Sequence, residues 1–126
     1  MRVEKTVEEK FTIIKVLAEK VDSRIAPQLK TEFVNLVTQG ARNLILNLEE
    51  VKYIDSSGLS SILVANRSCS GGGGVLVITG VNPHVNKLFQ ISQLTTVLNI
   101  SPTLEEARDF VFMHEMERDI LDAEKE

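Results

Sequence analysis

Residues 53–63 place polar side chains at the point where a predicted strand meets a predicted helix. An apolar run, 44–48, leads into this stretch, and apolar residues at helical spacing follow Gly58. Backbone N–H groups in the first turn of a helix are unpaired, and the helix dipole favours negative charge there. Asp55, Ser56 and Ser57 therefore lie where the fold would tolerate a phosphate on a serine, and where its charge would change the surface sharply.

Apolar runs alternate with helical patterns along the rest of the chain. A short edge strand and four further strands are predicted at 3–7, 11–17, 44–48, 75–79 and 98–100. Helices are predicted from about Ile25 to Gly40, from the serine pair to about Cys69, over 83–91, and after Ser101. This alternation predicts an α/β fold, a sheet with helices packed on it.

Four consecutive glycines, Gly71–Gly74, follow the helix that begins at the serine pair. Glycine loses much backbone entropy inside a regular element, so 70–74 is predicted to be a flexible loop. A phosphate-binding loop follows a strand, opens a helix and ends in Lys-Ser or Lys-Thr. The glycine run follows a helix and precedes a strand, so we do not expect nucleotide binding, and its role stays open.

Composition narrows the class of protein. The 126 residues, 43% of them hydrophobic, suit one domain with its own core. No apolar run is long enough to cross a membrane, and the first residues do not resemble a secretory signal. A single cysteine, Cys69, excludes an internal disulfide and favours the cytoplasm. A net charge of −4, with no Trp and one Tyr, gives no footprint for nucleic acid.

The residues that could support catalysis do not combine into a known site. His84 and His114 lie thirty positions apart without a second metal ligand at the usual spacing. Ser57, His84 and Asp55 could be arranged as a triad, but the Gly-x-Ser-x-Gly elbow is absent. Cys69 has no Cys-x-x-Cys partner. We therefore expect no enzyme activity, no metal and no cofactor.

The helix after the serine pair has two predicted faces. Leu59, Ile62 and Leu63, together with Asn66, fall on one side, which is the expected core face. The opposite side carries small side chains, here called the small-residue face: Ser57, Ser60, Ser61, Val64 and Ser68. Two interpretations of this face stay open on the pattern alone. It is either a solvated surface or a flat docking surface that lets the backbone of a partner come close.

The chain resembles the STAS domain, named for sulphate transporters and anti-sigma factor antagonists. The order of elements matches from about Val3 to Val111, and three segments resemble the bacterial anti-anti-sigma branch: 46–48, 54–59 and 82–89. The resemblance implies a single STAS-type domain, a small, mostly parallel mixed sheet flanked by helices, over 1–112. It also favours the docking interpretation of the small-residue face.

The resemblance further implies a function and a set of site residues. Ser57 matches the serine that accepts phosphate, and Asp22 matches an acidic position that helps partner recognition, although Asp22 also suits an ordinary helix N-cap. The implied partner-binding residues are Asp22, Asp55, Ser56, Ser57, Gly58, Ser60, Ser61 and Val64. The implied role is that of an anti-sigma factor antagonist. An anti-sigma factor that is also a serine kinase switches it off by phosphorylation, and a metal-dependent phosphatase restores it.

The alternative is a non-switching scaffold subunit of a stress-signalling or lipid-transport complex. Binding of a small nucleotide or lipid is a third class, for which the sequence offers no clear polar pocket.

The segment 113–126 is predicted to be a charged helical extension. One apolar group, Leu104, Ala107 and Val111, suits packing on the sheet. A second group, here called the apolar stripe, is rotated by about half a turn: Met113, Met116 and Ile120. One straight helix cannot bury both groups against one sheet. We therefore expect a kink near Phe112, a homodimer through this helix, or fraying into solvent.

Overall fold

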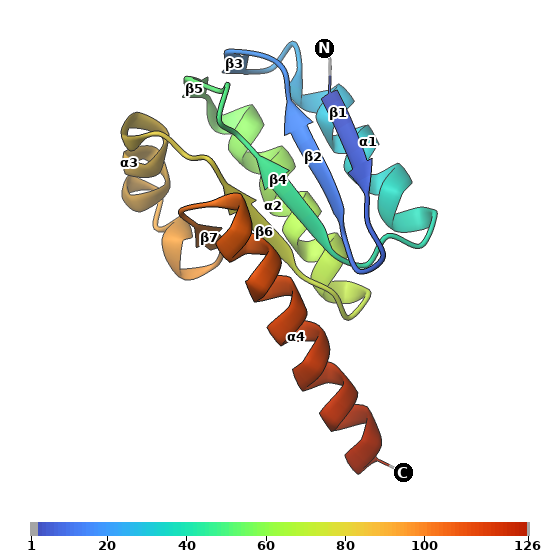
Figure 1. Ribbon diagram of the computed structural model, residues 1–126. Coiled ribbons are helices and arrows are strands. Elements are labelled where there is room, and N and C mark those ends of the chain that lie inside the picture. The colour runs from blue at the N-terminus through green and yellow to red at the C-terminus, as the bar shows by residue number, and fades with distance from the viewer. Residues whose placement is uncertain (1–2, 126) are drawn as a thin grey trace.

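The computed structural model describes residues 3–125, which form one layer of sheet between two layers of helices. Strand and helix order follows the alternation expected from the sequence (Figure 1). The elements are β1 (Val3–Val7), β2 (Thr12–Val16), β3 (Lys20–Val21), α1 (Ala26–Thr38), β4 (Leu44–Asn47), β5 (Tyr53–Ile54), α2 (Ser56–Gly71), β6 (Leu76–Thr79), α3 (Pro83–Ile91), a 3-10 turn η1 (Leu94–Thr96), β7 (Asn99–Ser101) and α4 (Leu104–Glu124).

The main sheet has five strands in the order β1-β2-β4-β6-β7. β1 pairs antiparallel with β2, and the other three pairings are parallel. Helices α1 and α2 cover one face of this sheet, and α4 crosses the other face (Figure 1). The expected α/β fold, a small and mostly parallel mixed sheet flanked by helices, is confirmed.

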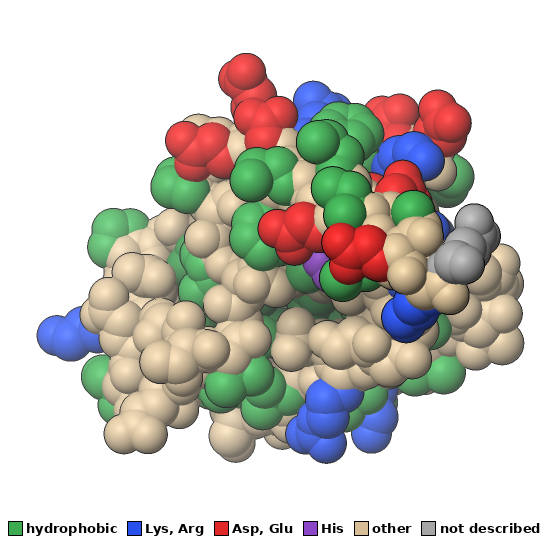
Figure 2. All heavy atoms as spheres, turned by 90° about the horizontal axis from the view of Figure 1, so that it is seen from below, with side chains coloured by type: hydrophobic (Ala, Val, Ile, Leu, Met, Phe, Trp, Pro, Cys, Tyr) green, Lys and Arg blue, Asp and Glu red, His purple; other side chains and the backbone are tan. Residues whose placement is uncertain are grey.

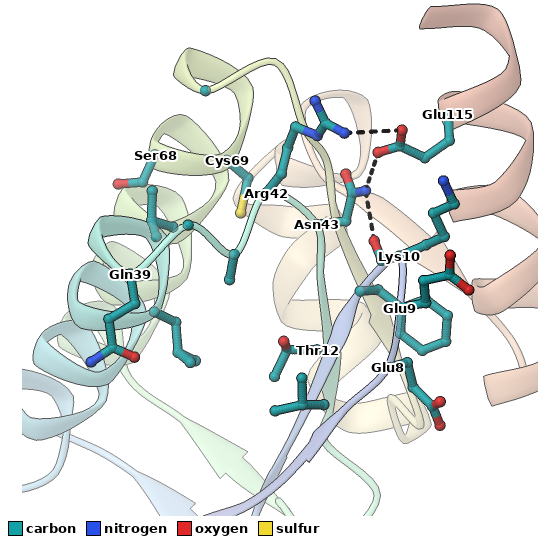
Figure 3. A pocket seen from close by; sticks show the side chains of 17 residues that line it. Glu8, Glu9, Lys10, Thr12, Gln39, Arg42, Asn43, Ser68, Cys69 and Glu115 are labelled. Carbon is teal, nitrogen blue, oxygen red and sulfur yellow. Dashed lines mark hydrogen bonds and ion pairs between the residues drawn. The ribbon is translucent and has the colours of Figure 1, made fainter. Parts of the chain in front are cut away.

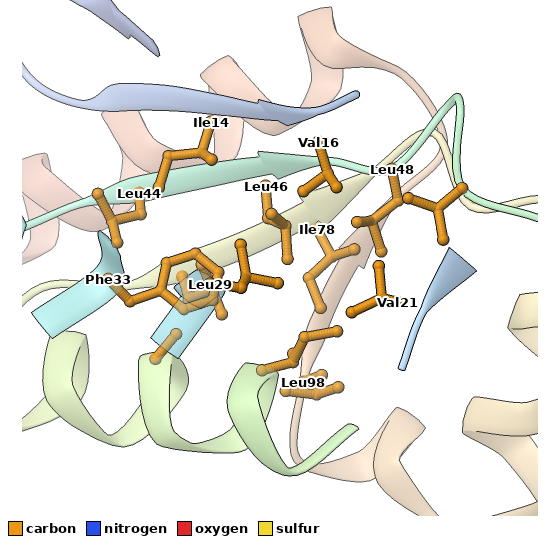
Figure 4. Close-up of a cluster of buried hydrophobic side chains, with 14 of the residues drawn as sticks. Ile14, Val16, Val21, Leu29, Phe33, Leu44, Leu46, Leu48, Ile78 and Leu98 are labelled. Atoms are coloured by element: carbon orange, nitrogen blue, oxygen red, sulfur yellow. The ribbon is translucent and has the colours of Figure 1, made fainter. Parts of the chain in front are cut away.

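The central strands are buried on both faces, which explains their continuous apolar runs. On β4, Leu44 and Leu46 point into the larger core with Leu29 and Phe33 of α1 (Figure 4). Ile45, between them, points to the opposite face and packs with the α4 residues of the smaller core. Both cores therefore depend on the alternation of side chains along the same strands.

Several boundaries differ from the sequence prediction. Helix α2 continues to Gly71, so only Gly72–Gly74 form the connection that was expected over 70–74. A second, two-stranded sheet pairs β3 with β5, where a plain connection was expected. Strands of two residues show no measurable alternation, so the sequence carries no signal for this sheet. The last strand, β7, is shifted by one residue from its predicted position.

The core face of α2 also differs from the prediction. Its buried residues are Gly58, Ser61, Ile62, Ala65 and Cys69, whereas Leu59 and Leu63 are half-buried at the edge of the core. Mostly small side chains face inward because α2 packs closely against α1 and, at Gly58, against Val21 of β3. The prediction gave too much weight to the large leucines and placed the core face about a quarter turn away.

Helix α4 runs without interruption from Leu104 to Glu124, so the expected kink near Phe112 is not seen. Its first half packs on the sheet, with Ala107 and Val111 fully buried. Phe112 contacts the ring of Phe11 edge to face, with ring centroids 6.0 Å apart. Across residues 3–125, no helix combines the length and the apolar character needed to cross a membrane.

Candidate phosphorylation and partner-binding site

The start of α2 is fixed by Asp55, which is the N-cap of the helix. Its backbone is extended, and its carboxylate accepts a hydrogen bond from the backbone N–H of Gly58 at 3.0 Å. The backbone N–H of Asp55 donates to the carbonyl of Val21 at 3.1 Å, which ties this point to β3. Ser56 and Ser57 therefore occupy the first two helical positions. The N–H groups of these positions have no partner inside the helix, and the helix dipole is positive there.

Gly58 allows the first turn of α2 to contact β3 directly. A Cβ at this position would lie 2.6 Å from the carbonyl oxygen of Val21 and 2.7 Å from Cγ2 of Ile54. No side chain fits at these distances without a shift of backbone. Gly58 is buried, so it positions the serine pair and offers no side chain to a partner.

A groove of about 540 Å³ lies between the N-terminal ends of α1 and α2. Ser57 is half-buried at the groove, and Ser56 and Ser60 are exposed beside it. Lys30 is the one charged side chain among the lining residues. The lining residues are Ser23, Ala26, Pro27, Lys30, Ser56, Ser57, Ser60 and Ser61. Four serines of α2 and the ammonium group of Lys30 therefore line one open groove.

The structure separates the predicted partner-binding residues into two sets. Ser56, Ser57 and Ser60 lie together at the groove, and Val64 follows one turn later, half-buried. Ser61 was predicted on the small-residue face, but its side chain is 2% exposed and its hydroxyl donates to the Gly58 carbonyl at 2.7 Å. That placement is a correction, because Ser61 belongs to the inward side of α2 at the floor of the groove.

Asp22 lies in the turn between β3 and α1 and is engaged with Arg24. Its carboxylate accepts hydrogen bonds from the Arg24 guanidinium at 2.8 Å and from the Arg24 backbone N–H at 3.0 Å. These bonds lower the pKa of Asp22 below its ordinary value. The N-cap of α1 is Ile25, without a side-chain cap, so the prediction that Asp22 caps this helix is wrong, and Asp22 instead lies in the turn before it.

Lys30 is the groove residue that sequence reasoning missed. It lies on α1, and it lines the same groove as the serine pair because α1 and α2 pack side by side. Lys30 and Ser56 are 26 positions apart on different helices, and their proximity leaves no mark in either helical pattern, so a single sequence gives no signal for it.

The residues considered for catalysis remain apart. Exposed His84 lies on α3, and it does not line the serine groove. Burial raises the pKa of the Cys69 thiol to about 11, which leaves little thiolate at neutral pH. Within the described chain, no three His, Cys, Asp or Glu side chains are grouped to hold a metal ion.

A second hollow, of about 590 Å³, lies at the opposite end of the sheet (Figure 3). Asn43 organises it: the side-chain amide donates to the Lys10 carbonyl and to Glu115, and its oxygen accepts from the Val75 N–H at 2.9 Å. Arg42 also pairs with Glu115, at 3.3 Å. These contacts hold α4 to the loop before β4, which carries Arg42 and Asn43, and this end of the molecule is remote from Ser57.

Comparison with known proteins assigns the fold and the motif to one family. Residues 2–107 match the STAS domain, and the chain belongs to the STAS domain family. The anti-sigma-B factor antagonist of Staphylococcus aureus is 29% identical over 105 residues, which cover 83% of this chain and 96% of that protein. A Bordetella bronchiseptica protein named for anti-sigma factor antagonism is 32% identical, over 75% of this chain and 82% of that protein.

A solved structure supports the same relationship. The Bacillus cell fate determinant SpoIIAA, in its phosphorylated form, superposes with a TM-score of 0.67 at 26% identity. The superposition covers 87% of this chain and 99% of SpoIIAA. The resemblance expected from the sequence, to the anti-sigma factor antagonist branch, is therefore confirmed.

Proposed function

We propose that this protein is a cytoplasmic anti-sigma factor antagonist, controlled by phosphorylation of Ser57. The unphosphorylated form binds an anti-sigma factor and thereby releases a sigma factor. The anti-sigma factor is also the serine kinase that modifies Ser57, and a metal-dependent serine phosphatase reverses the modification. The protein itself supplies no catalytic group. Two relatives named as antagonists, and a structural relative solved with phosphate attached, support this role.

The position of Ser57 carries the proposal. It is the second residue of α2, half-buried beside an open groove, so its hydroxyl lies at a surface rather than in the core. A phosphate there is stabilised by the dipole and the free N–H groups of the first helical turn, and Lys30 lies across the groove. Phosphorylation therefore leaves the fold intact.

The same phosphate opposes partner binding at this surface. It adds a charge of about −2 and three oxygen atoms to a rim otherwise formed by small hydroxyl groups. Ser56, Ser60 and Val64 continue that rim along α2. Asp55 and Asp22 flank it as the acidic groups of the contact surface, with Gly58 and Ser61 supporting it from beneath.

Intact-mass measurement and site mapping of the protein from its own host test the proposal. We expect one phosphate at Ser57, removed by phosphatase and absent from the Ser57→Ala variant. Capture experiments should then recover a serine kinase with the unphosphorylated form only. Absence of phosphate on Ser57 through growth and stress would overturn the switch and favour a scaffold role.

A further inference from the structure

The C-terminal half of α4 exposes an unusual amount of apolar surface. Met113, Met116 and Ile120, the apolar stripe, are 62%, 62% and 58% exposed. Six of the eleven large hydrophobic side chains that are exposed between residues 3 and 125 lie within 110–121. Contiguous exposed apolar surface of this kind marks an interaction site in soluble proteins.

Contacts on the opposite side of α4 hold this surface in a fixed orientation. Glu115, only 5% exposed, points back to Arg42 and Asn43 (Figure 3). One turn further on, Arg118 donates to the carbonyl of Gly73. The helix is therefore anchored as far as Arg118, and the apolar stripe faces away from the domain.

The glycine run has a structural role in this anchoring. A Cβ on Gly73, which has φ of +82°, would collide with the Arg118 guanidinium, and one on Gly74 would collide with the backbone of Arg42. Gly74 thus allows the loop before β4 to approach closely, and Gly73 adopts the left-handed backbone from which its carbonyl binds Arg118. The glycine run therefore contributes to the anchoring of α4, which accounts for it without a bound ligand.

The stripe follows a heptad spacing that continues beyond its three residues. Met113, Met116, Ile120 and Ala123 are separated by steps of three, four and three, whereas the preceding position of this register is a charged residue, Asp109. In this register the flanking positions from Met116 onward are occupied by Glu117, Asp119 and Glu124, all acidic, whereas the earlier ones hold Phe110 and Phe112. Such flanking charges decide which helix can pair with an apolar seam.

A second copy of this chain, an anionic membrane and a helix of another protein could each cover the apolar stripe. The charge of the segment argues against the first two. Residues 104–126 carry nine acidic and three basic side chains, a net charge of −6, against −4 for the whole chain. Viewed from the end at which α4 terminates, the acidic side chains lie over one half of the face, with hydrophobic and a few basic side chains among them (Figure 2). A second copy would place Asp119 opposite Glu124 in a parallel pair, and an anionic membrane would repel the same carboxylates.

We propose that the apolar stripe of α4 docks an amphipathic helix of another protein, one whose apolar seam is flanked by Lys and Arg. The basic flanks would pair with Glu117, Asp119 and Glu124 while the seam covers the methionines. Helix α2 spans 16 residues, about 24 Å, between Ser57 and the loop that anchors α4. Docking at the stripe is therefore independent of the phosphorylation state of Ser57.

Two designed peptides test this inference. Both carry leucine at the seam positions over three heptads, with lysine flanks in one and glutamate flanks in the other. Fluorescence anisotropy should show the lysine peptide binding the full-length protein at least tenfold more tightly than the glutamate peptide. Met116→Ser with Ile120→Ser should abolish that binding, whereas Ile91→Ser, at an apolar site that is 69% exposed elsewhere, should leave it unchanged.

Charge reversal and phosphomimicry complete the test. Glu117→Lys with Asp119→Lys and Glu124→Lys should reverse the preference between the peptides, and Ser57→Asp should leave it unaltered. Equal binding of both peptides, or binding of neither, would overturn the inference. Self-association of the wild type in light scattering that Met116→Ser removes would instead establish a second copy as the occupant. None of these readouts depends on an anti-sigma factor, so failure here leaves the proposed function standing.

Discussion

The carboxylate of Asp55 and the backbone N–H of Gly58, 3.0 Å apart, together define where α2 begins. The bond caps the helix one residue before Ser56, and the absence of a side chain on Gly58 lets the same turn lie against Val21. The position of Ser57 in the first turn follows from these two neighbours. The helix cap and the proposed phosphorylation site therefore share the first turn of α2.

Replacing Asp55 tests the cap. Asp55→Ala should lower the free energy of unfolding by about 1 kcal/mol, because one N–H of the first turn loses its acceptor. Asp55→Asn should retain most of that stability, since an amide oxygen can accept the same bond. Urea denaturation of the three proteins measures both changes, and an equal loss in the two variants would assign the effect to charge rather than to capping.

Adding one methyl group at Gly58 tests the close contact. Gly58→Ala should destabilise the protein by about 1–3 kcal/mol, because the new Cβ meets a backbone carbonyl that cannot move freely. Gly71→Ala is the matched control: it lies in the same helix, and its Cβ would meet nothing within 4 Å. Thermal unfolding should show a lower Tm for the first variant only. A similar Tm for both would contradict the packing role of Gly58.

The sequence predicted the fold well where periodicity extends over many residues. The runs at 44–48 and 75–79 became the central strands, and the hydroxyl and acids at Thr103, Glu105 and Glu106 mark the observed start of α4. The two-residue pairing of β3 with β5 escaped prediction because it depends on tertiary contacts.

The candidate site was predicted in part. The placement of Ser57 at the start of a helix follows from local sequence, and the structure agrees. Burial of Ser61 and the position of Lys30 depend on how α1 packs against α2, which neither helical pattern encodes. Small inward residues on α2 also made its core face hard to recognise from hydrophobicity alone.

Negative charge at Ser57 should weaken binding to the anti-sigma factor. Ser57→Asp should lower affinity by some tens- to thousandfold, which corresponds to about 2–4 kcal/mol, whereas Ser57→Ala should bind whether or not the kinase is active. Ser70→Asp adds the same charge at the other, exposed end of α2, away from the groove, and serves as the positional control. Surface plasmon resonance against the purified partner measures all three. Wild-type affinity in Ser57→Asp would contradict the mechanism.

Pairing with Arg24 should be visible in the titration of Asp22. Hydrogen bonds from Arg24 hold the pKa of Asp22 below 3.8, so the contribution of this pair to stability is present above that value and is lost as pH falls through the folded-state pKa. Carboxyl chemical shifts in NMR should give a midpoint below 3.8, which Arg24→Gln should raise. Unchanged titration in that variant would show that Arg24 does not hold the carboxylate in solution.

Removal of the buried carboxylate of Glu115 should loosen α4. Glu115→Ala leaves Arg42 without its partner and Asn43 with one acceptor fewer, at a cost of about 1–3 kcal/mol in unfolding free energy. Glu117→Ala, two positions on and exposed, should change stability by no more than about 0.5 kcal/mol. Hydrogen exchange should also accelerate in residues 112–121 of the first variant while the central strands stay protected. Uniform exchange through α4 in both variants would show that packing on the sheet, rather than Glu115, holds the helix.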